Sequence, residues 1–362
     1  MTACSQITTH QAIPEGRSLQ RLYARHAGPG KFYERTPKPN CYTRSVPDRT
    51  RQAELSRTAT AVLLGTLLAG MSASSLDAGS RSGSAQDSPS PIELVRAAVA
   101  NAVAAANDDS TKHMFRSRKQ TAQGSQTRLY VETREAIVGI TIAYNDKPLG
   151  PEQMHGEEGR LADLVGHPEQ LRRKHAQEQE SAERTLRIVK ALPDAFLFDY
   201  DGEERGTADL GRDGARLVRL KFRPNPAYRA PSHVEDVLAG MQGIVLIDSA
   251  ARRIARIDGT LFKEVGFGWG ILGHLDKGGH FLVEQCDVGD GSWDVSHMSL
   301  GFTGKILLFK SLAIKSDEVF SDFRRVPADT TFAQGVEMLK AEQAKLAENY
   351  KPGAAATDPK SH

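Results

Sequence analysis

The sequence predicts an α+β protein in which a few helices cover one large, curved antiparallel β-sheet, an incomplete β-barrel. Most of residues 243–314 forms short apolar segments separated by turn signals. No helical pattern of about 10–15 residues separates these segments, which argues against parallel βαβ units and for a meander. Residues 215–225 alternate strictly, as expected for an antiparallel strand with one buried and one solvated face. The alternation places Val218, Leu220 and Phe222 on one face and Arg219, Lys221 and Arg223 on the other.

A helix is predicted at the start of the folded part. Ser90 and Glu93 fit a capping box, and Pro91 occupies the first helical position. Apolar residues then recur at helical spacing as far as Ala106. Residues 113–144 are rich in Tyr, Val, Ile and Thr, which predicts strands.

Residues 151–192 return to a helical pattern, with a strongly charged middle part that includes the favourably ordered pair Glu180 and Arg184. Pro193 is predicted to end this helix. A last helix is predicted from about Thr331 to Tyr350. Turns are predicted at Asp258-Gly259, Lys277-Gly278-Gly279 and Asp290-Gly291.

An export signal is predicted near the start of the chain. Residues 59–73 form an uncharged apolar run that follows three arginines and precedes small residues, so residues 59–78 fit a secretory signal peptide. The run is shorter than the about 20 apolar residues that a spanning helix needs. Residues 1–58 lack a hydrophobic period, and we expect a disordered extension or a start assigned too far upstream.

The remaining chain is expected to be a periplasmic or secreted protein of the bacterial envelope without a transmembrane span. We expect a linker at 79–89, a single half-barrel domain at 90–350 with a helical insertion at 151–192, and a disordered tail at 351–362. Basic residues exceed acidic ones in residues 1–58 but not beyond residue 79, so nucleic-acid binding is not expected. Only Cys286 lies beyond the leader, where a small buried apolar role is expected.

The motifs predict neither a cofactor nor a catalytic site. Residues 268–273 match GxGxxG, but no helix follows to hold a pyrophosphate, so a glycine-rich bend is expected instead. His274, His280 and His297 lie near several aspartates without metal-ligand spacing, so no metal site is predicted. Motifs of serine hydrolases, zinc proteases and P-loop proteins are absent from the sequence.

Several segments carry a resemblance to a known family. ALPDAF (191–196), VRLKFRPNP (218–226), residues 253–295 and residues 302–327 together resemble a largely uncharacterised family of exported bacterial proteins. The order of elements also resembles the outer-membrane lipoprotein-sorting (LolA/LolB-like) fold. This resemblance implies an incomplete antiparallel barrel covered by helices, with a cavity for acyl chains.

We therefore expect a non-enzymatic envelope protein that binds an acyl chain, lipid or lipoprotein in an apolar half-barrel cavity. Two alternatives remain open. The first is an envelope sensor or scaffold with a packed barrel, which would bind a protein partner through Arg172–Lys174 and the basic row 219–223. The second is a hydrolase with an unrecognised site that uses His274, His280 and an aspartate. The expected cavity wall consists of Phe222, Phe262, Phe267, Trp269, Ile271 and Trp293.

Overall fold

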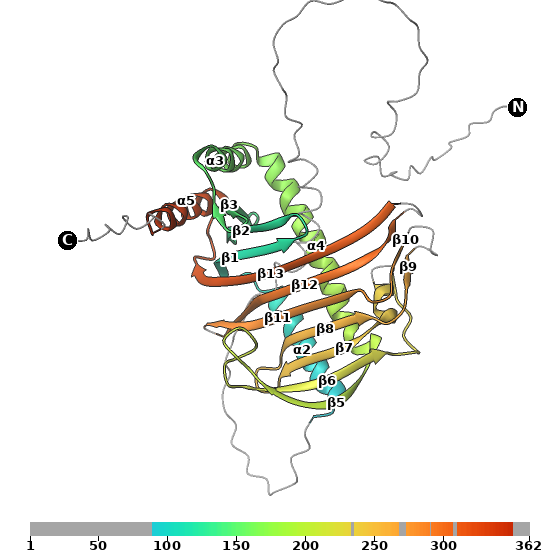
Figure 1. The fold of residues 1–362 in the computed structure, drawn as a ribbon. Helices are drawn as coiled ribbons and strands as arrows, with labels where there is room; N and C mark the ends of the chain where they lie inside the picture. Colours follow the sequence, from blue (N-terminus) through green and yellow to red (C-terminus); the bar gives the residue numbers. More distant parts are fainter. Residues whose placement is uncertain (1–88, 233–234, 268–272, 290, 307–309, 350–362) are drawn as a thin grey trace, which may run out of the picture. The chain divides into compact units, whose positions relative to one another are not determined.

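The computed structural model describes residues 89–232, 235–267, 273–289, 291–306 and 310–349, which belong to one compact unit. Its centre is a 13-stranded sheet in which all strand pairs are antiparallel (Figure 1). The predicted fold class is confirmed. The main path of the sheet has two ends, β4 and β5, and the sheet does not close into a barrel. The path runs β4-β3-β2-β1-β13-β12-β11-β8-β7-β6-β5, and β9 and β10 extend it beside β12.

The helical elements are α2 (Pro91–Ala106), α3 (Pro151–Gly166), α4 (Pro168–Ala195), the 3₁₀ helix η2 (Glu235–Gly240) and α5 (Phe332–Asn349). The strands are β1 (Lys112–Thr121), β2 (Gly124–Val131), β3 (Val138–Tyr144), β4 (Lys147–Pro148), β5 (Phe196–Arg205), β6 (Arg216–Pro224), β7 (Met241–Asp248), β8 (Arg253–Leu261), β9 (Val265–Phe267), β10 (Gly273–Leu275), β11 (His280–Gly289), β12 (Ser292–Ile306) and β13 (Lys310–Val326).

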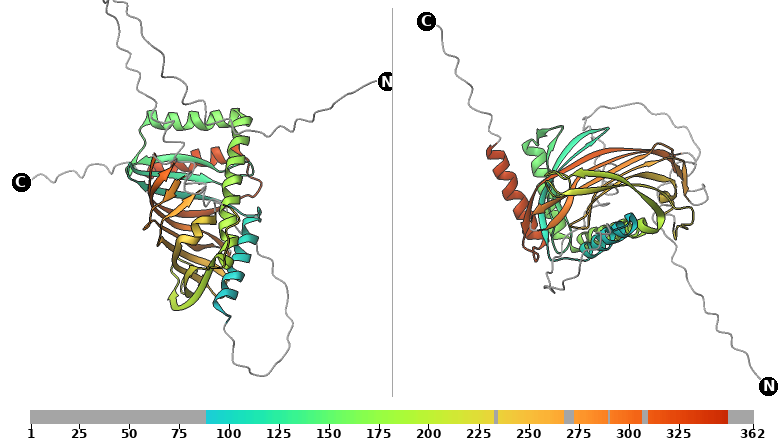
Figure 2. Two further views of the ribbon diagram at one scale, coloured as in Figure 1. Left: turned by 90° about the vertical axis from the view of Figure 1, so that its right-hand side faces the viewer. Right: turned by 90° about the horizontal axis from the view of Figure 1, so that it is seen from below.

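The predicted alternation of β6 is confirmed and defines two faces of the sheet. Val218, Leu220 and Phe222 are buried in a core that α2 and the C-terminal part of α4 complete. We call this side the inner face, and Figure 2 shows both helices lying against it. Arg219 and Lys221 point to the opposite, outer face, where both pair with Asp201 of β5.

The other end of the sheet is covered from the opposite side. Strand register places Leu129 of β2 and Ile140 of β3 on the outer face, in line with Arg118 of β1. Leu129 and Ile140 form a second core with Leu161 of α3 and Leu339 of α5. The helices therefore cover the inner face at β5–β8 and the outer face at β1–β3.

Helix α4 connects these two ends. Its 28 residues correspond to about 42 Å, and they lead from α3, beside β3, to β5 at the far edge. Side chains of α3 and α4 also cap the backbone of β3. Glu157 accepts a hydrogen bond from the Thr141 amide, Arg160 donates to the Gly139 carbonyl, and Glu178 accepts from the amide of Ile137. Such capping satisfies backbone groups that a neighbouring strand would otherwise pair.

Two local predictions are wrong. Pro193 lies inside α4, which continues to Ala195 because Leu192 and Ala195 are buried in the inner-face core. That burial offsets the backbone hydrogen bond that proline cannot donate. Asp258-Gly259 is not a turn, since both residues lie within β8 and Gly259 pairs with Gly243 of β7.

Other local predictions are confirmed. Ser90 and Glu93 form the capping box, with the Ser90 amide donating to Glu93 over 2.9 Å. The pair Glu180–Arg184 forms on α4. The last helix, α5, agrees closely with its predicted range. Strand β13 continues past the predicted strand region to Val326, and β5 was not predicted as a strand.

We expect Gly243→Ala to lower the free energy of unfolding by about 3 kcal/mol. An added Cβ at Gly243 would lie 1.9 Å from the backbone oxygen of Asp258, so the paired strands would have to separate. Urea unfolding measures the change. The matched control is Gly301→Ala in β12, where a Cβ meets nothing within 4 Å and a change within about 0.5 kcal/mol is expected. Equal stability of the two variants would contradict this account of the close β7–β8 approach.

Candidate functional site

A cavity of about 470 Å³ lies where the pairing of β1 with β13 becomes irregular, close to α5. The register passes from Met114–Arg324 to Arg116–Ser321, which leaves one extra residue on β13. Asp322, at this bulge, has a φ of 59°, in the left-handed region. The cavity is lined by Met114, Phe115, Arg116, Leu129, Asp322, Phe323, Arg324 and Glu342.

The cavity combines apolar walls with a charged rim. Phe115 stacks against Phe323 with ring centroids 5.5 Å apart. At the rim, Arg324 donates a hydrogen bond to the Glu342 carboxylate at 2.8 Å, which lowers the pKa of Glu342. Cavities of about 300–1,000 Å³ with apolar walls and a few polar groups are typical of small-molecule sites.

Arg116 is the rim group with the least satisfied charge. Its Nε lies 3.1 Å from Asp322, but this atom is buried and makes no hydrogen bond of good geometry. The side chains of the pair are 36% and 52% exposed, and such exposed ion pairs contribute about 0–1 kcal/mol. The guanidinium of Arg116 can therefore exchange Asp322 for an anionic group of a ligand at little cost.

Of the six residues predicted to line a cavity, the structure describes the side chains of Phe222, Phe262 and Trp293. Phe222 is buried in the inner-face core, where its ring centroid lies 4.7 Å from that of Phe196. Trp293 is buried in another cluster with Leu217, whose side chain lies on the opposite face of β6. Phe262 follows β8 and is partly exposed under Lys263. The side chain of Phe267, together with Trp269 and Ile271, lies outside the described residues, as does the rest of the glycine-rich bend at 268–272.

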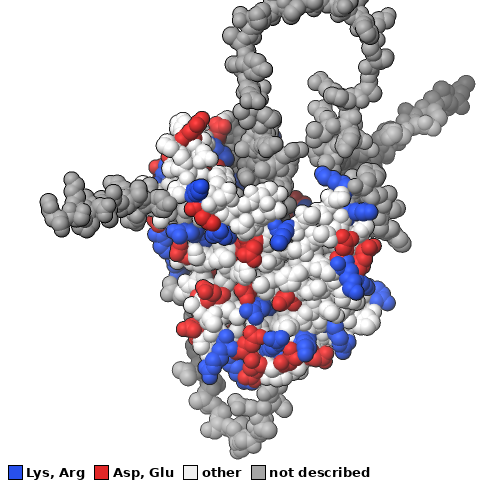
Figure 3. All heavy atoms as spheres, in the orientation of Figure 1, with Lys and Arg blue, Asp and Glu red and all other residues white. Residues whose placement is uncertain are grey.

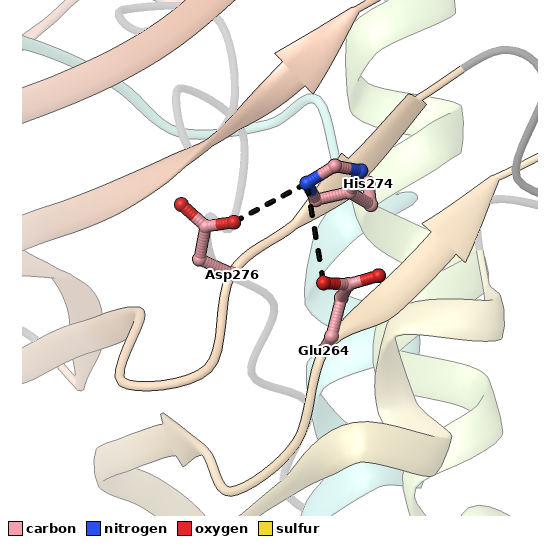
Figure 4. A group of neighbouring side chains, drawn as sticks. All are labelled: Glu264, His274 and Asp276. Atoms are coloured by element: carbon pink, nitrogen blue, oxygen red, sulfur yellow. Dashed lines mark ion pairs between the residues drawn. The ribbon is translucent and has the colours of Figure 1, made fainter. Parts of the chain in front are cut away.

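The candidate hydrolase residues do not converge. His274 faces Lys305 and His280 faces Gly301 along the same side of β12, so their backbones are about 13 Å apart. His280 pairs with Asp258 at 3.1 Å. His274 lies between Glu264 and Asp276, as Figure 4 shows.

The outer face carries a network of ion pairs across β5, β6, β8, β11, β12 and β13. Arg219 bridges Asp201 and Glu204, and Arg256 bridges Glu204 and Glu284. His297 continues the network, because its Nδ1 lies 3.1 Å from Glu284 and its Nε2 lies 3.0 Å from Asp317. Burial lowers the pKa of His297, but its hydrogen bonds to the two carboxylates outweigh this and raise it. Figure 3 shows acidic and basic groups side by side over the lower strands of this face.

Two carboxyl groups have raised pKa values: that of the buried Glu132, which follows β2, and that of the half-buried Asp294 in β12. Glu132 accepts a hydrogen bond from the His113 amide at 2.9 Å. Burial, and then the charge of Asp294, raise the pKa of Glu132 well above its ordinary value. Burial raises the pKa of Asp294 to about 7, and one of its carboxyl oxygens has no hydrogen-bond partner. The predicted burial of Cys286 is confirmed, and this burial raises the pKa of its thiol to about 11, which disfavours the thiolate.

Comparisons with known proteins add little to this geometry. No protein-family model matches the sequence, and no curated protein matches it. Among solved structures, the chain is similar to a DUF1329 family protein from Desulfovibrio piger ATCC 29098. The sequence identity is 9% and the TM-score is 0.21, covering 65% of this chain and 92% of that chain. A TM-score this low carries no argument about function. No helix within the described ranges is long and apolar enough to span a membrane.

We expect the wild type to lose stability as the pH rises from 4 to about 7, and we expect Asp294→Asn to lose less. The folded protein holds the Asp294 carboxyl neutral, because its pKa is raised from 3.8 to about 7. Its contribution to stability is therefore present near pH 4 and is lost as the pH rises to about 7. Urea unfolding between pH 4 and pH 8 measures this contribution as the difference between the wild type and the variant.

The matched control is Asp329→Asn, at an exposed position. It removes a carboxyl group from the surface and shows the effect of an Asp→Asn exchange away from Asp294. Parallel pH profiles for Asp294→Asn and the wild type would contradict the burial of a neutral carboxyl group.

Proposed function

We propose that this protein binds an amphiphilic ligand, with an acyl chain and an anionic end group, in the cavity between the β1–β13 bulge and α5. The proposal rests on one observation: apolar walls and the incompletely paired Arg116 line the same cavity. Binding requires no catalytic group. Each methylene that leaves water contributes about 0.8 kcal/mol, before the cost of ordering the ligand.

The proposed end group follows from the chemistry of Arg116. A guanidinium offers paired donors that suit a carboxylate or a phosphate. Because Asp322 and Glu342 balance the charges of Arg116 and Arg324, the rim is not strongly basic. A single negative charge on an apolar molecule therefore fits better than a polyanion. A bacterial envelope location and a lipid or lipoprotein ligand are consistent with this chemistry and form part of the proposal.

A protein-partner function is the second candidate, and one observation favours it. The inner face at β5–β8 is filled by side chains of α2, α4 and the sheet, as a packed barrel would be. Most of the basic groups expected to meet a partner are, however, already paired within the chain. Arg219 and Lys221 contact Asp201, and Arg172 and Lys174 contact Glu169 and Glu178. We therefore favour the cavity ligand.

We expect Glu342→Trp to weaken binding of a fluorescent fatty acid about tenfold or more, a change of about 1.4 kcal/mol. Glu342 lines the cavity from α5 with a side chain only 16% exposed, so an indole there fills space that the acyl chain needs. Fluorescence titration measures the dissociation constant. The control is Glu337→Trp on the same helix, where the side chain is 72% exposed and binding should not change. Equal affinities for both variants would place the ligand elsewhere.

We expect Arg116→Gln to distinguish a fatty acid from the fatty alcohol of the same length. A hydrogen bond to a charged group contributes about 1.5–3 kcal/mol, so fatty-acid affinity should fall at least tenfold. The alcohol should bind both proteins equally, because it has no carboxylate. Competition with the same fluorescent probe measures both ligands. If both ligands weakened equally, the substitution would have damaged the cavity rather than the recognition of the end group.

A further inference from the structure

Four histidines in the described part of the chain contact carboxylates, and they do so in different ways. His167 contacts one carboxylate, that of Asp163. His280 contacts one carboxylate, that of Asp258. His297 contacts two, but through different ring nitrogens, so the carboxylates lie on opposite sides of the imidazole. His274 contacts two carboxylates through the same atom, Nε2 (Figure 4). Only in this last arrangement can a single cation bind the imidazole nitrogen in place of a proton and contact both carboxylates at once.

The register of a short hairpin brings these groups together. Strand β9 pairs with β10 so that Val265 faces Leu275 and Gly266 faces His274. Continuing this register places Glu264 opposite Asp276. His274 and Asp276 are two residues apart on one strand and therefore point to the same face. The Asp276 amide also donates a hydrogen bond to the Thr303 carbonyl of β12, which fixes the position of this ligand.

The distances suit a small divalent ion. The Nε2 atom of His274 lies 3.3 Å from Asp276 and 4.0 Å from Glu264, and the three possible ligand atoms lie within 4.8 Å of one another. Zinc bonds to nitrogen and oxygen at about 2.0–2.2 Å, so two of its ligands lie roughly 3.3 Å apart in a tetrahedral site. Glu264, whose side chain is 64% exposed, would have to approach Nε2 by about 0.7 Å to reach this spacing.

We propose that Glu264, His274 and Asp276 form a binding site for a first-row divalent metal ion such as Zn²⁺. One imidazole nitrogen and two carboxylate oxygens match the donors that Zn²⁺ accepts, and a fourth position would remain for water or another group. Two carboxylates with a neutral imidazole leave the occupied site without net charge. The bound ion would join the two strands of the hairpin at their base and hold them beside β12.

The competing interpretation is a set of ion pairs in which His274 carries a proton. Lys305 faces His274 in the register of β12 and is exposed, so it is an alternative cation for the carboxylates. Exposed ion pairs of this kind contribute about 0–1 kcal/mol, which a metal ion bound by three ligands would easily exceed. The two interpretations differ in whether the protein binds Zn²⁺ stoichiometrically at these residues.

Isothermal titration of the full chain, freed of metal with EDTA, tests the proposal with Zn²⁺ as the probe. We expect one Zn²⁺ binding event that is lost in His274→Ala. Glu264→Gln and Asp276→Asn should each weaken it by more than the roughly 10–100-fold that the loss of an outer-shell partner costs. X-ray absorption of the zinc-loaded protein should show nitrogen and oxygen ligands at about 2.0–2.1 Å and no sulfur.

The control is His280→Ala, which removes a histidine with a single carboxylate partner on the neighbouring strand β11. It should bind Zn²⁺ like the wild type. The same binding in His274→Ala and the wild type would overturn the proposal. So would loss of binding in His274→Ala without any effect of Glu264→Gln or Asp276→Asn, because a histidine alone would then account for it. Thermal unfolding without metal shows whether each variant is folded.

Discussion

Strands from the beginning and the end of the folded chain pair side by side in β1 and β13, and the rest of the structure depends on this contact. The pairing runs from Lys112–Val326 to Thr121–Ser316, so it joins residues about 200 positions apart. It connects the hairpins of β1–β4 to the meander of β5–β8 and β11–β13 in a single sheet. Closing so large a loop costs conformational entropy, which the buried side chains on both strands must offset. Without this pairing, neither the β bulge nor the cavity beside it would exist.

An open sheet of this size has two faces and two edges that would otherwise be free to pair with other sheets. In this chain, helices cover parts of both faces, and charged side chains occupy an edge and the open part of the outer face. Helices α2 and α4 bury the inner face at β5–β8, whereas α3 and α5 bury the outer face at β1–β3. The outer face that remains in contact with solvent carries the network of ion pairs through Arg219, Arg256 and His297. At β3, carboxylate and guanidinium groups of α3 and α4 satisfy backbone groups. Charged groups at an edge or on an open face oppose pairing with other sheets.

Both proposed sites occur where the regular ladder is interrupted. The cavity follows from one extra residue on β13, which turns Asp322 into the left-handed region and leaves Arg116 incompletely paired. The proposed metal site lies at the base of the hairpin β9–β10, where two strands of only three residues each bring three ligands to one face. Regular strands elsewhere supply the rigid frame, and the irregular positions supply the polar groups that face a ligand. Bulges are frequent next to functional sites for the same reason.

The type of fold follows from the amino-acid pattern alone, because periods of 2 and 3.6 residues depend only on local geometry. The alternation of Val218, Leu220 and Phe222 and the capping box at Ser90 were sufficient for β6 and for the start of α2. Tertiary packing decided that α4 continues past Pro193, because the neighbouring residues Leu192 and Ala195 are buried in the core. Tertiary structure also decided which residues come together at the two proposed sites. His274 and Asp276 were visible in the sequence, but Glu264 joins them only through the β9–β10 register, and the cavity residues meet only through the long-range β1–β13 pairing. No local pattern encodes which strands become neighbours.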